Sequence, residues 1–269
     1  MRLNKDPVLI VIFILIASAL YFFYSTDQKT VDAGEYRVIE VLDGDTVVID
    51  DGRHSSVRYL GIDTPEMARQ DSPGDPMAEE AKGYNEELVG EKQVKLEFDQ
   101  EKYDRYGRML ANVYVDGVFV NLELLRKGYA RHLIIEPNRK YEDSIMSAVK
   151  EAMKNRRGIW GDLRALKEPP GNGEYEIDIS KAGSYTGKRV VAEGVITDAR
   201  SSEKVVVLSM GDLLDIAIFA SDLANFEHFG IAPDTHYMGK RVRVTGRVRM
   251  YRGTPGITVG HPITIKVVK

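Results

Sequence analysis

Three short motifs carry the residue types of a site that acts on phosphate. Residues 43–46 are Asp-Gly-Asp-Thr and residues 63–66 are Asp-Thr-Pro-Glu, with Arg58 between them. A second arginine ends the stretch Asp-Arg-Tyr-Gly-Arg at 104–108. Carboxylate oxygens bind hard cations, a carboxylate can orient or deprotonate water, and the planar arginine fork matches a phosphate. Together the motifs predict a site that cleaves phosphodiester bonds.

Each motif alone has a simpler explanation. Asp-Gly-Asp-Thr is a common turn sequence, because Asp caps its own backbone and Gly adopts positive φ. Glu66 also fits the acidic first turn of a helix after Pro65. Arg58 and Arg108 could be ordinary surface charges. Two roles remain possible for Asp43. It either orients the metal ligands without binding the metal, or it only forms the hairpin turn.

The order and spacing of these motifs resemble the staphylococcal-nuclease (thermonuclease) family, from about Tyr36 to Trp160. The resemblance includes the stretches 110–117 and 120–130 and the closing Gly-Ile-Trp at 158–160. It implies a calcium-dependent endonuclease that hydrolyses DNA and RNA and leaves 3′-phosphate ends. The catalytic groups it implies are Arg58, Glu66 and Arg108, and the Ca²⁺ ligands are Asp45, Asp63 and the backbone carbonyl of Thr64. Magnesium is the alternative metal.

The predicted substrate pocket has one departure from the family. Arg105 and Tyr106, beside the second catalytic arginine, are candidate substrate contacts. Leu133 and Ile135, in contrast, stand where well-known family members carry tyrosines that contact the bound nucleotide. Because stacking on a base contributes about 1–3 kcal/mol, we expect weaker nucleotide binding here rather than altered phosphate chemistry.

Composition excludes several classes of protein. The 269 residues are 43% hydrophobic and 29% charged, an ordinary globular mixture with room for two domains. There is no cysteine, which excludes disulfides and thiolate zinc sites. The five histidines are scattered, and no Gly-rich phosphate loop or serine nucleophile motif is present, so we expect no nucleotide cofactor. A monomer is expected.

The N-terminal residues differ in kind from the rest. Residues 8–24 form an almost wholly apolar run preceded by Arg2 and Lys5, which predicts a transmembrane or signal-anchor segment at 1–25 and a polar tether at 26–35. Ala17-Ser18-Ala19 has the form of a signal cleavage site, but the apolar run continues beyond it, which favours an uncleaved anchor. The expected location is the cell membrane, single-pass with the remainder outside, or secreted after cleavage.

Residues 36–161 are predicted to form a mainly β, α+β domain. Short β-branched runs broken by Asp-Gly turns predict strands between Tyr36 and Ile62. Further strands are predicted at 94–98, 110–115 and 118–120, a loop at 70–76, and helices at 77–88, 121–127 and 141–155. Asn121 is the predicted N-cap of the second helix. The resulting five-stranded barrel with three helices agrees with the oligonucleotide/oligosaccharide-binding (OB) type of barrel that the resemblance implies.

A second domain is predicted at 174–269, after a Pro/Gly linker at 162–173. Strands are predicted at 190–196, 205–209, 215–219, 240–250 and 257–268, with a helical insert near 221–229. This pattern resembles a nucleic-acid-binding OB domain, without a decisive motif, and gives the chain two OB-type barrels in tandem.

Charge separates the two predicted domains. Residues 35–161 hold 19 basic and 25 acidic residues, whereas residues 174–269 hold 13 and 11. The long strand at 240–250 alternates apolar and basic positions, so one face carries Arg241, Arg243, Arg247, Arg249 and the following Tyr251. These residues are candidate substrate contacts, although a solvated outer strand face explains the pattern equally well.

Two other functions compete with a nuclease. Some relatives keep the barrel but serve only as binding scaffolds, which the presence of Arg58, Glu66 and Arg108 opposes. The second alternative is a surface protein that captures DNA for uptake, in which cleavage is weak or incidental.

Overall fold

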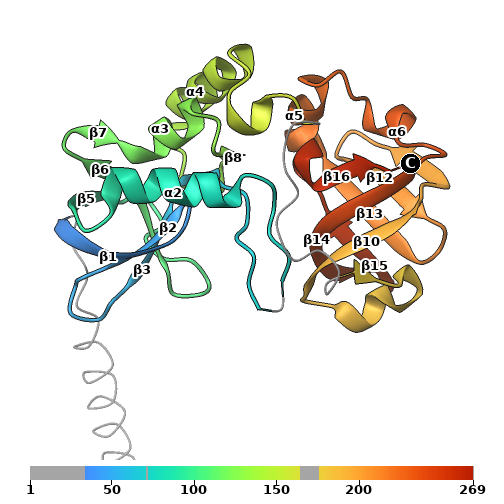
Figure 1. Ribbon diagram of the computed structural model, residues 1–269, viewed down its shortest axis with the longest axis horizontal. Coiled ribbons are helices and arrows are strands. Elements are labelled where there is room, and N and C mark those ends of the chain that lie inside the picture. Colours follow the sequence, from blue (N-terminus) through green and yellow to red (C-terminus); the bar gives the residue numbers. More distant parts are fainter. Residues whose placement is uncertain (1–33, 71, 164–175, 269) are drawn as a thin grey trace, which may run out of the picture. The chain divides into compact units, whose positions relative to one another are not determined.

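The structure is a computed structural model that describes residues 34–70, 72–163 and 176–268 (Figure 1). The apolar segment predicted at 1–25 and most of the predicted linker lie outside these residues. Residues Glu35–Lys269 form one compact unit. Within the described ranges, the helices are all too short or too polar to cross a membrane.

The first half of this unit is a closed barrel. Its strands are β1 (Glu35–Asp43), β2 (Thr46–Ile49), β3 (Ser56–Tyr59), β5 (Gln93–Glu97) and β6 (Met109–Val115). They pair in the order β3-β2-β1-β5-β6, and a parallel pairing of β3 with β6 closes the ring. The predicted five-stranded barrel is confirmed. The short β7 (Val118–Phe119) extends β6 through a hairpin turn at Asp116-Gly117, both with positive φ as such a turn requires.

Three helices pack beside the barrel (Figure 1). They are α2 (Ala78–Val89), α3 (Val120–Arg126) and α4 (Glu142–Lys154), within one or two residues of the predicted bounds. The predicted cap of α3 is wrong, because Phe119 is the N-cap and Asn121 is fully buried within the helix. The Asn121 side chain accepts a hydrogen bond from Val113 N–H at 3.0 Å and donates one to the Leu60 carbonyl at 2.9 Å. It therefore joins α3 to the middle of β6 and to the residue between β3 and β4.

A separate two-stranded ribbon carries part of the predicted site. It pairs β4 (Gly61–Asp63) with β8 (Arg131–Leu133) in antiparallel fashion, so Asp63 lies opposite Arg131. After α4, the short η1 (Gly158–Trp160) ends the first half, and its tryptophan is completely buried.

The second half is built on a sheet of eight strands, β9 to β16. They are β9 (Glu176–Ile177), β10 (Arg189–Val195), β11 (Asp198–Ser201), β12 (Val205–Met210), β13 (Leu214–Phe219), β14 (Arg241–Tyr251), β15 (Thr254–Thr258) and β16 (Ile265–Val267). The pairing order is β11-β12-β13-β15-β14-β10-β9, with β16 on β14. The predicted helical insert is confirmed as η3 (Ala220–Asp222) and α5 (Leu223–Glu227). The other short helices are η2 (Ile179–Tyr185), α6 (Pro233–His236) and η4 (Pro262–Thr264).

The predicted five strands of this half are wrong in number. β9 and β11 have two and four residues, too few for a recognisable alternation. The strand expected at 257–268 is divided, because Pro262 has no N–H for a ladder and begins η4 instead. His261 reinforces the break, since its Nδ1 accepts the Ile263 N–H at 3.1 Å.

Candidate active site

The turn between β1 and β2 holds Asp45 against the second acidic motif. Its Oδ2 accepts the Thr64 backbone N–H at 2.8 Å, and its Oδ1 accepts the Thr46 hydroxyl at 3.0 Å. Gly44 makes this approach possible, because a Cβ there would lie 2.8 Å from Thr64 Cγ2. The glycine is therefore required by packing between the two motifs and not by the turn, because its φ is not positive, contrary to the expectation for this turn sequence.

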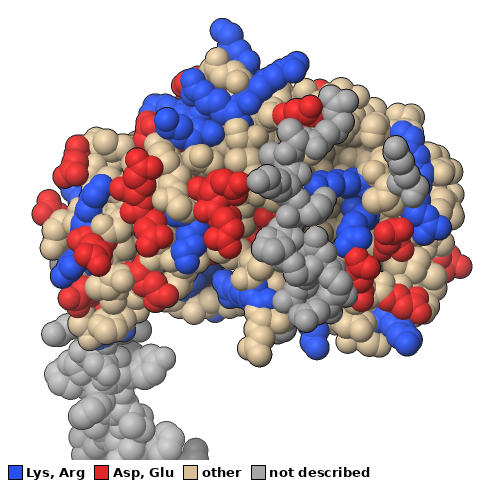
Figure 2. Space-filling model, in the orientation of Figure 1, with Lys and Arg blue, Asp and Glu red and all other residues tan. Residues whose placement is uncertain are grey.

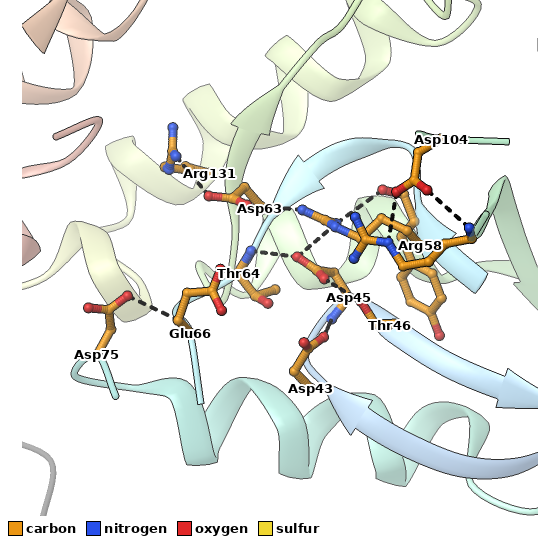
Figure 3. Close-up of polar contacts among 12 residues, drawn as sticks. Asp43, Asp45, Thr46, Arg58, Asp63, Thr64, Glu66, Asp75, Asp104 and Arg131 are labelled. Atoms are coloured by element: carbon orange, nitrogen blue, oxygen red, sulfur yellow. Dashed lines mark hydrogen bonds and ion pairs between the residues drawn. The ribbon is translucent and has the colours of Figure 1, made fainter. Parts of the chain in front are cut away.

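Arg58 joins the two carboxylates predicted to bind metal. Its guanidinium lies 2.8 Å from Asp45 Oδ2 and 2.9 Å from Asp63 Oδ1, and its side chain is 12% exposed. The pairing of β3 with β2 sets this geometry, since Arg58 lies opposite Thr46 in the register. Figure 3 shows Asp63 between Arg58 on one side and Arg131 on the other.

Asp43 supports the site from behind. Its carboxylate accepts the Asp45 N–H at 3.1 Å, and its carbonyl accepts the Asn85 side chain of α2, also at 3.1 Å. The fully buried Asn85 in turn accepts the Tyr59 hydroxyl at 3.0 Å. Asp43 thus shapes the hairpin, and Asn85 of α2 links that hairpin to β3.

The donor set around Asp45 suits a hard cation. Burial raises the pKa of Asp45 to about 8; Arg58 opposes this rise, and the charges of Asp43 and Asp63 add to it. A positive ion bound beside this carboxyl would favour its charged form, and oxygen donors without nitrogen or sulfur match calcium. Within the described ranges, the surroundings of Asp45 included, no three His, Cys, Asp or Glu side chains gather as a metal-binding group.

Glu66 lies beside this cluster and lines a cavity of about 480 Å³. The same cavity is lined by Asp63 and Thr64 from the first half and by Arg189 from the second. Although Glu66 is exposed, partial desolvation in this hollow raises its pKa; Arg189 opposes the rise, and Asp63 and other carboxylates add to it. A carboxylate with a raised pKa, reached by solvent through a cavity, is suited to receive a proton from water.

Arg108 lies on a loop of its own. Asp104 Oδ2 accepts its Nε at 2.8 Å, and Asp104 Oδ1 accepts the N–H groups of Tyr106 and Arg108 at 2.8 and 3.0 Å. The exposed Tyr106 ring lies 4.8 Å from the Arg105 guanidinium and 5.8 Å from that of Arg108. Among the described contacts, none joins this group directly to Asp45 or Glu66.

Further residues, which the sequence did not single out, surround Asp63 and Glu66. Arg131 lies 2.7 Å from Asp63 and 3.2 Å from Asp222 of the second half. Asp75 accepts the Glu66 N–H at 3.1 Å and pairs with Arg189. The register of β4 with β8 would identify Arg131, but that pairing joins segments almost 70 residues apart and has no local sequence signal.

The arginine face of β14 divides into two pairs. Arg241 and Arg243 lie near Glu193 of β10, and Arg243 also pairs with Glu176. Arg247 and Arg249 line the cavity that contains Glu66. Tyr251 is exposed and is not among the residues that line this cavity.

The two positions that lack the expected tyrosines also differ from each other. Leu133 lines the cavity with Asp63 and Glu66, whereas Ile135 is 62% exposed and is not part of the cavity lining.

Known proteins match the first half of the chain. A model of the family described as "Staphylococcal nuclease homologue" matches residues 56–162. Thermonuclease of Staphylococcus hyicus is 36% identical over 141 residues, which cover 52% of this chain and 83% of that protein. Thermonuclease of Staphylococcus intermedius is 40% identical over 138 residues, covering 51% and 80%. Endonuclease YncB of Bacillus subtilis is 44% identical over 122 residues, covering 44% and 58%.

These matches include most of the site. Arg58, the 63–66 motif and Arg108 lie within residues 56–162, whereas the β10–β16 sheet lies outside that range. The extent of the similarity to both thermonucleases, with the closed barrel and the paired acidic motifs, identifies the first half. The chain belongs to the family of staphylococcal nuclease homologues.

Proposed function

We propose that this protein is a calcium-dependent endonuclease that hydrolyses phosphodiester bonds of DNA and RNA. The observation that carries the proposal is the contact of Arg58 with Asp45 and Asp63, next to the cavity-lining Glu66. The names of the relatives, thermonuclease and endonuclease, support the same class of reaction. Because these groups address phosphate rather than bases, we expect little sequence preference.

In the proposed reaction, a water oxygen attacks phosphorus and the bond from phosphorus to the 5′ oxygen breaks. Glu66 orients this water or accepts its proton. Arg58 and Arg108 donate hydrogen bonds to the phosphoryl oxygens, which gain negative charge in the transition state. The products carry a 3′-phosphate and a 5′-hydroxyl.

Calcium fits the donors that the site offers. Asp45, Asp63 and the Thr64 carbonyl would hold the ion, and water would supply further oxygens. When bound, calcium supplies positive charge beside the scissile phosphate. The shared guanidinium of Arg58 keeps the two carboxylates close together, which preorganises them for a common ligand.

The second half is proposed to help hold long substrates. The barrel half has a net charge of −6, and Figure 2 shows acidic side chains gathered over α2, whose outer residues include Glu79 and Glu80. Such a face repels a polyanion. The second half has a net charge of +2 and directs Arg247 and Arg249 into the cavity, where they can contact phosphates of the same strand.

The location of the protein is a further proposal. The apolar run at 8–24 supports a single-pass anchor in the cell membrane, with the catalytic region outside and monomeric. Fractionation of cells, followed by protease treatment of intact cells, tests this orientation.

The central experiment incubates residues 35–269 with single- and double-stranded DNA and RNA, in calcium, magnesium or chelator. We expect internal cleavage in calcium, 3′-phosphate ends, and loss of activity in chelator and in Asp45→Asn. Full activity in excess chelator would exclude the proposed metal. Tight binding of DNA without cleavage would instead favour capture of DNA as the function.

A further inference from the structure

The loop that carries Glu66 is held by an arginine from the other half of the protein. Arg189, the first residue of β10, donates from its Nε to the Pro73 carbonyl at 3.1 Å. Its terminal nitrogen pairs with Asp75 Oδ1, and the two side chains are 13% and 7% exposed. This contact is therefore a buried ion pair with an additional backbone hydrogen bond, not a loose surface contact.

Asp75 continues the contact to Glu66. Its second carboxylate oxygen accepts the Glu66 N–H at 3.1 Å, and its own N–H donates to the Glu66 carbonyl at 2.8 Å. The Asp75 carbonyl accepts the N–H of Ala78, the first residue of α2, at 3.3 Å. Asp75 thus closes the base of the loop at the residue that carries the proposed catalytic carboxylate (Figure 3).

The electrostatics make Asp75 depend on Arg189. A buried carboxylate needs a compensating positive charge, and the guanidinium provides both charge and directed hydrogen bonds. Without it, Asp75 would be protonated or would turn towards solvent, and either change weakens the hydrogen bond to Glu66 N–H. The position of Glu66 would then be less well defined.

We propose that Arg189 is a positioning residue for Glu66, acting through Asp75. The β9–β16 half is then part of the catalytic apparatus and not only a binding attachment. This inference rests on the proposed role of Glu66. A displacement of about 1 Å in a reacting group can lower turnover about 100-fold, so the effect is measurable in kcat.

The test compares three variants of the full chain with wild type on one single-stranded DNA oligonucleotide in calcium. Arg189→Ala is expected to lower kcat about 10- to 100-fold with less than about a threefold change in KM. Arg189→Lys keeps the charge but cannot serve Pro73 and Asp75 together, so partial recovery is expected. Arg200→Ala is the matched control, because it removes an arginine of the same half that pairs with Asp198 and Asp215. Its kcat should equal that of wild type.

A double-mutant cycle separates positioning from substrate binding. In a Glu66→Gln background, Arg189→Ala should cause no further loss, because the group it positions is already absent. Additive losses, or a raised KM with unchanged kcat, would overturn the inference.

Hydrogen exchange supplies a readout that does not depend on activity. In Arg189→Ala, the amides of Glu66 and Asp75 should exchange faster, while those of β1 and β6 remain protected. Unchanged exchange at Glu66 would contradict the inference even if the wild type were inactive. An inactive wild type would contradict the proposed function instead.

Discussion

The two loops that carry the proposed catalytic groups are held in opposite ways. The Arg108 loop is stabilised from within, because Asp104 receives three hydrogen bonds from residues two and four positions later. The Glu66 loop is stabilised from a distance, because its closing residue Asp75 pairs with an arginine 114 positions away. The barrel alone can therefore form one loop, whereas the other requires the second half of the chain.

This difference affects how precisely the Glu66 and Arg108 side chains are positioned, not whether they are present. Local hydrogen bonds form whenever the loop forms, since all partners lie within five residues. Burial raises the pKa of Asp104, but hydrogen bonds from Arg108 and Tyr106 outweigh it and hold this pKa below its usual range. The Asp104–Arg108 ion pair therefore persists at neutral pH. The Glu66 loop depends instead on the contact of its Asp75 with Arg189 of β10.

The largest expected effect comes from removing either catalytic group. Glu66→Gln and Arg108→Ala should each lower kcat by about 10²–10⁴-fold, because both groups act on the transition state. Steady-state kinetics, with circular dichroism to verify the fold, measures this. If either variant kept near-normal turnover, the substituted group would not be catalytic.

A smaller effect is expected from the local support. Asp104→Ala should lower kcat about tenfold, because Arg108 loses its Nε partner and the turn loses three hydrogen bonds. Hydrogen exchange at Glu66 should not change in this variant. Faster exchange at Glu66 would mean that the two loops are coupled, contrary to the separation described above.

The two arginine pairs of β14 test how the second half assists binding. Arg247→Ser with Arg249→Ser should raise KM for long single-stranded DNA several-fold. The slope of log affinity against log salt should also become shallower, by about 0.7 for each phosphate that the variant no longer neutralises. Arg241→Ser with Arg243→Ser should have a smaller effect, because these side chains already pair with glutamates. Equal effects of the two pairs would indicate binding along the whole strand face.

Substitution of His261 is expected to have the smallest effect on activity but a clear effect on stability. Burial, Arg131 and His228 lower the pKa of this histidine well below 6.5, and its ring lies 4.7 Å from that of Trp160. Below pH 6.5, the His261 ring binds a proton in the unfolded state but not in the folded state. The free energy of unfolding therefore falls as pH falls. The loss reaches up to about 2 kcal/mol at pH 5.

Denaturant unfolding between pH 7.5 and 5 measures this loss. His261→Asn removes the titrating ring and should flatten the stability profile in that window by the same amount. An unchanged slope would show that His261 is already protonated in the folded protein, and that the contact between the two halves does not depend on its neutral form.

The sequence determined the barrel and pointed to the candidate site residues. Period-two alternation and Asp-Gly turns specified five strands, since each strand buries one face and each turn is local. The motifs 43–46 and 63–66 made Asp45, Asp63 and Glu66 candidates because their residue types match calcium and phosphate chemistry. The 104–108 motif could also be recognised in the sequence, because its residue types match phosphate chemistry.

Tertiary structure alone decided which residues support the site. Arg131, Asp75 and Arg189 have ordinary sequence surroundings, and only the packing of distant segments places them beside Asp63 and Glu66. The arginine alternation in β14 was visible, but its division into glutamate-paired and cavity-lining pairs was not. A side chain's type is written in the sequence, whereas its partner depends on strand register and on what folds against it.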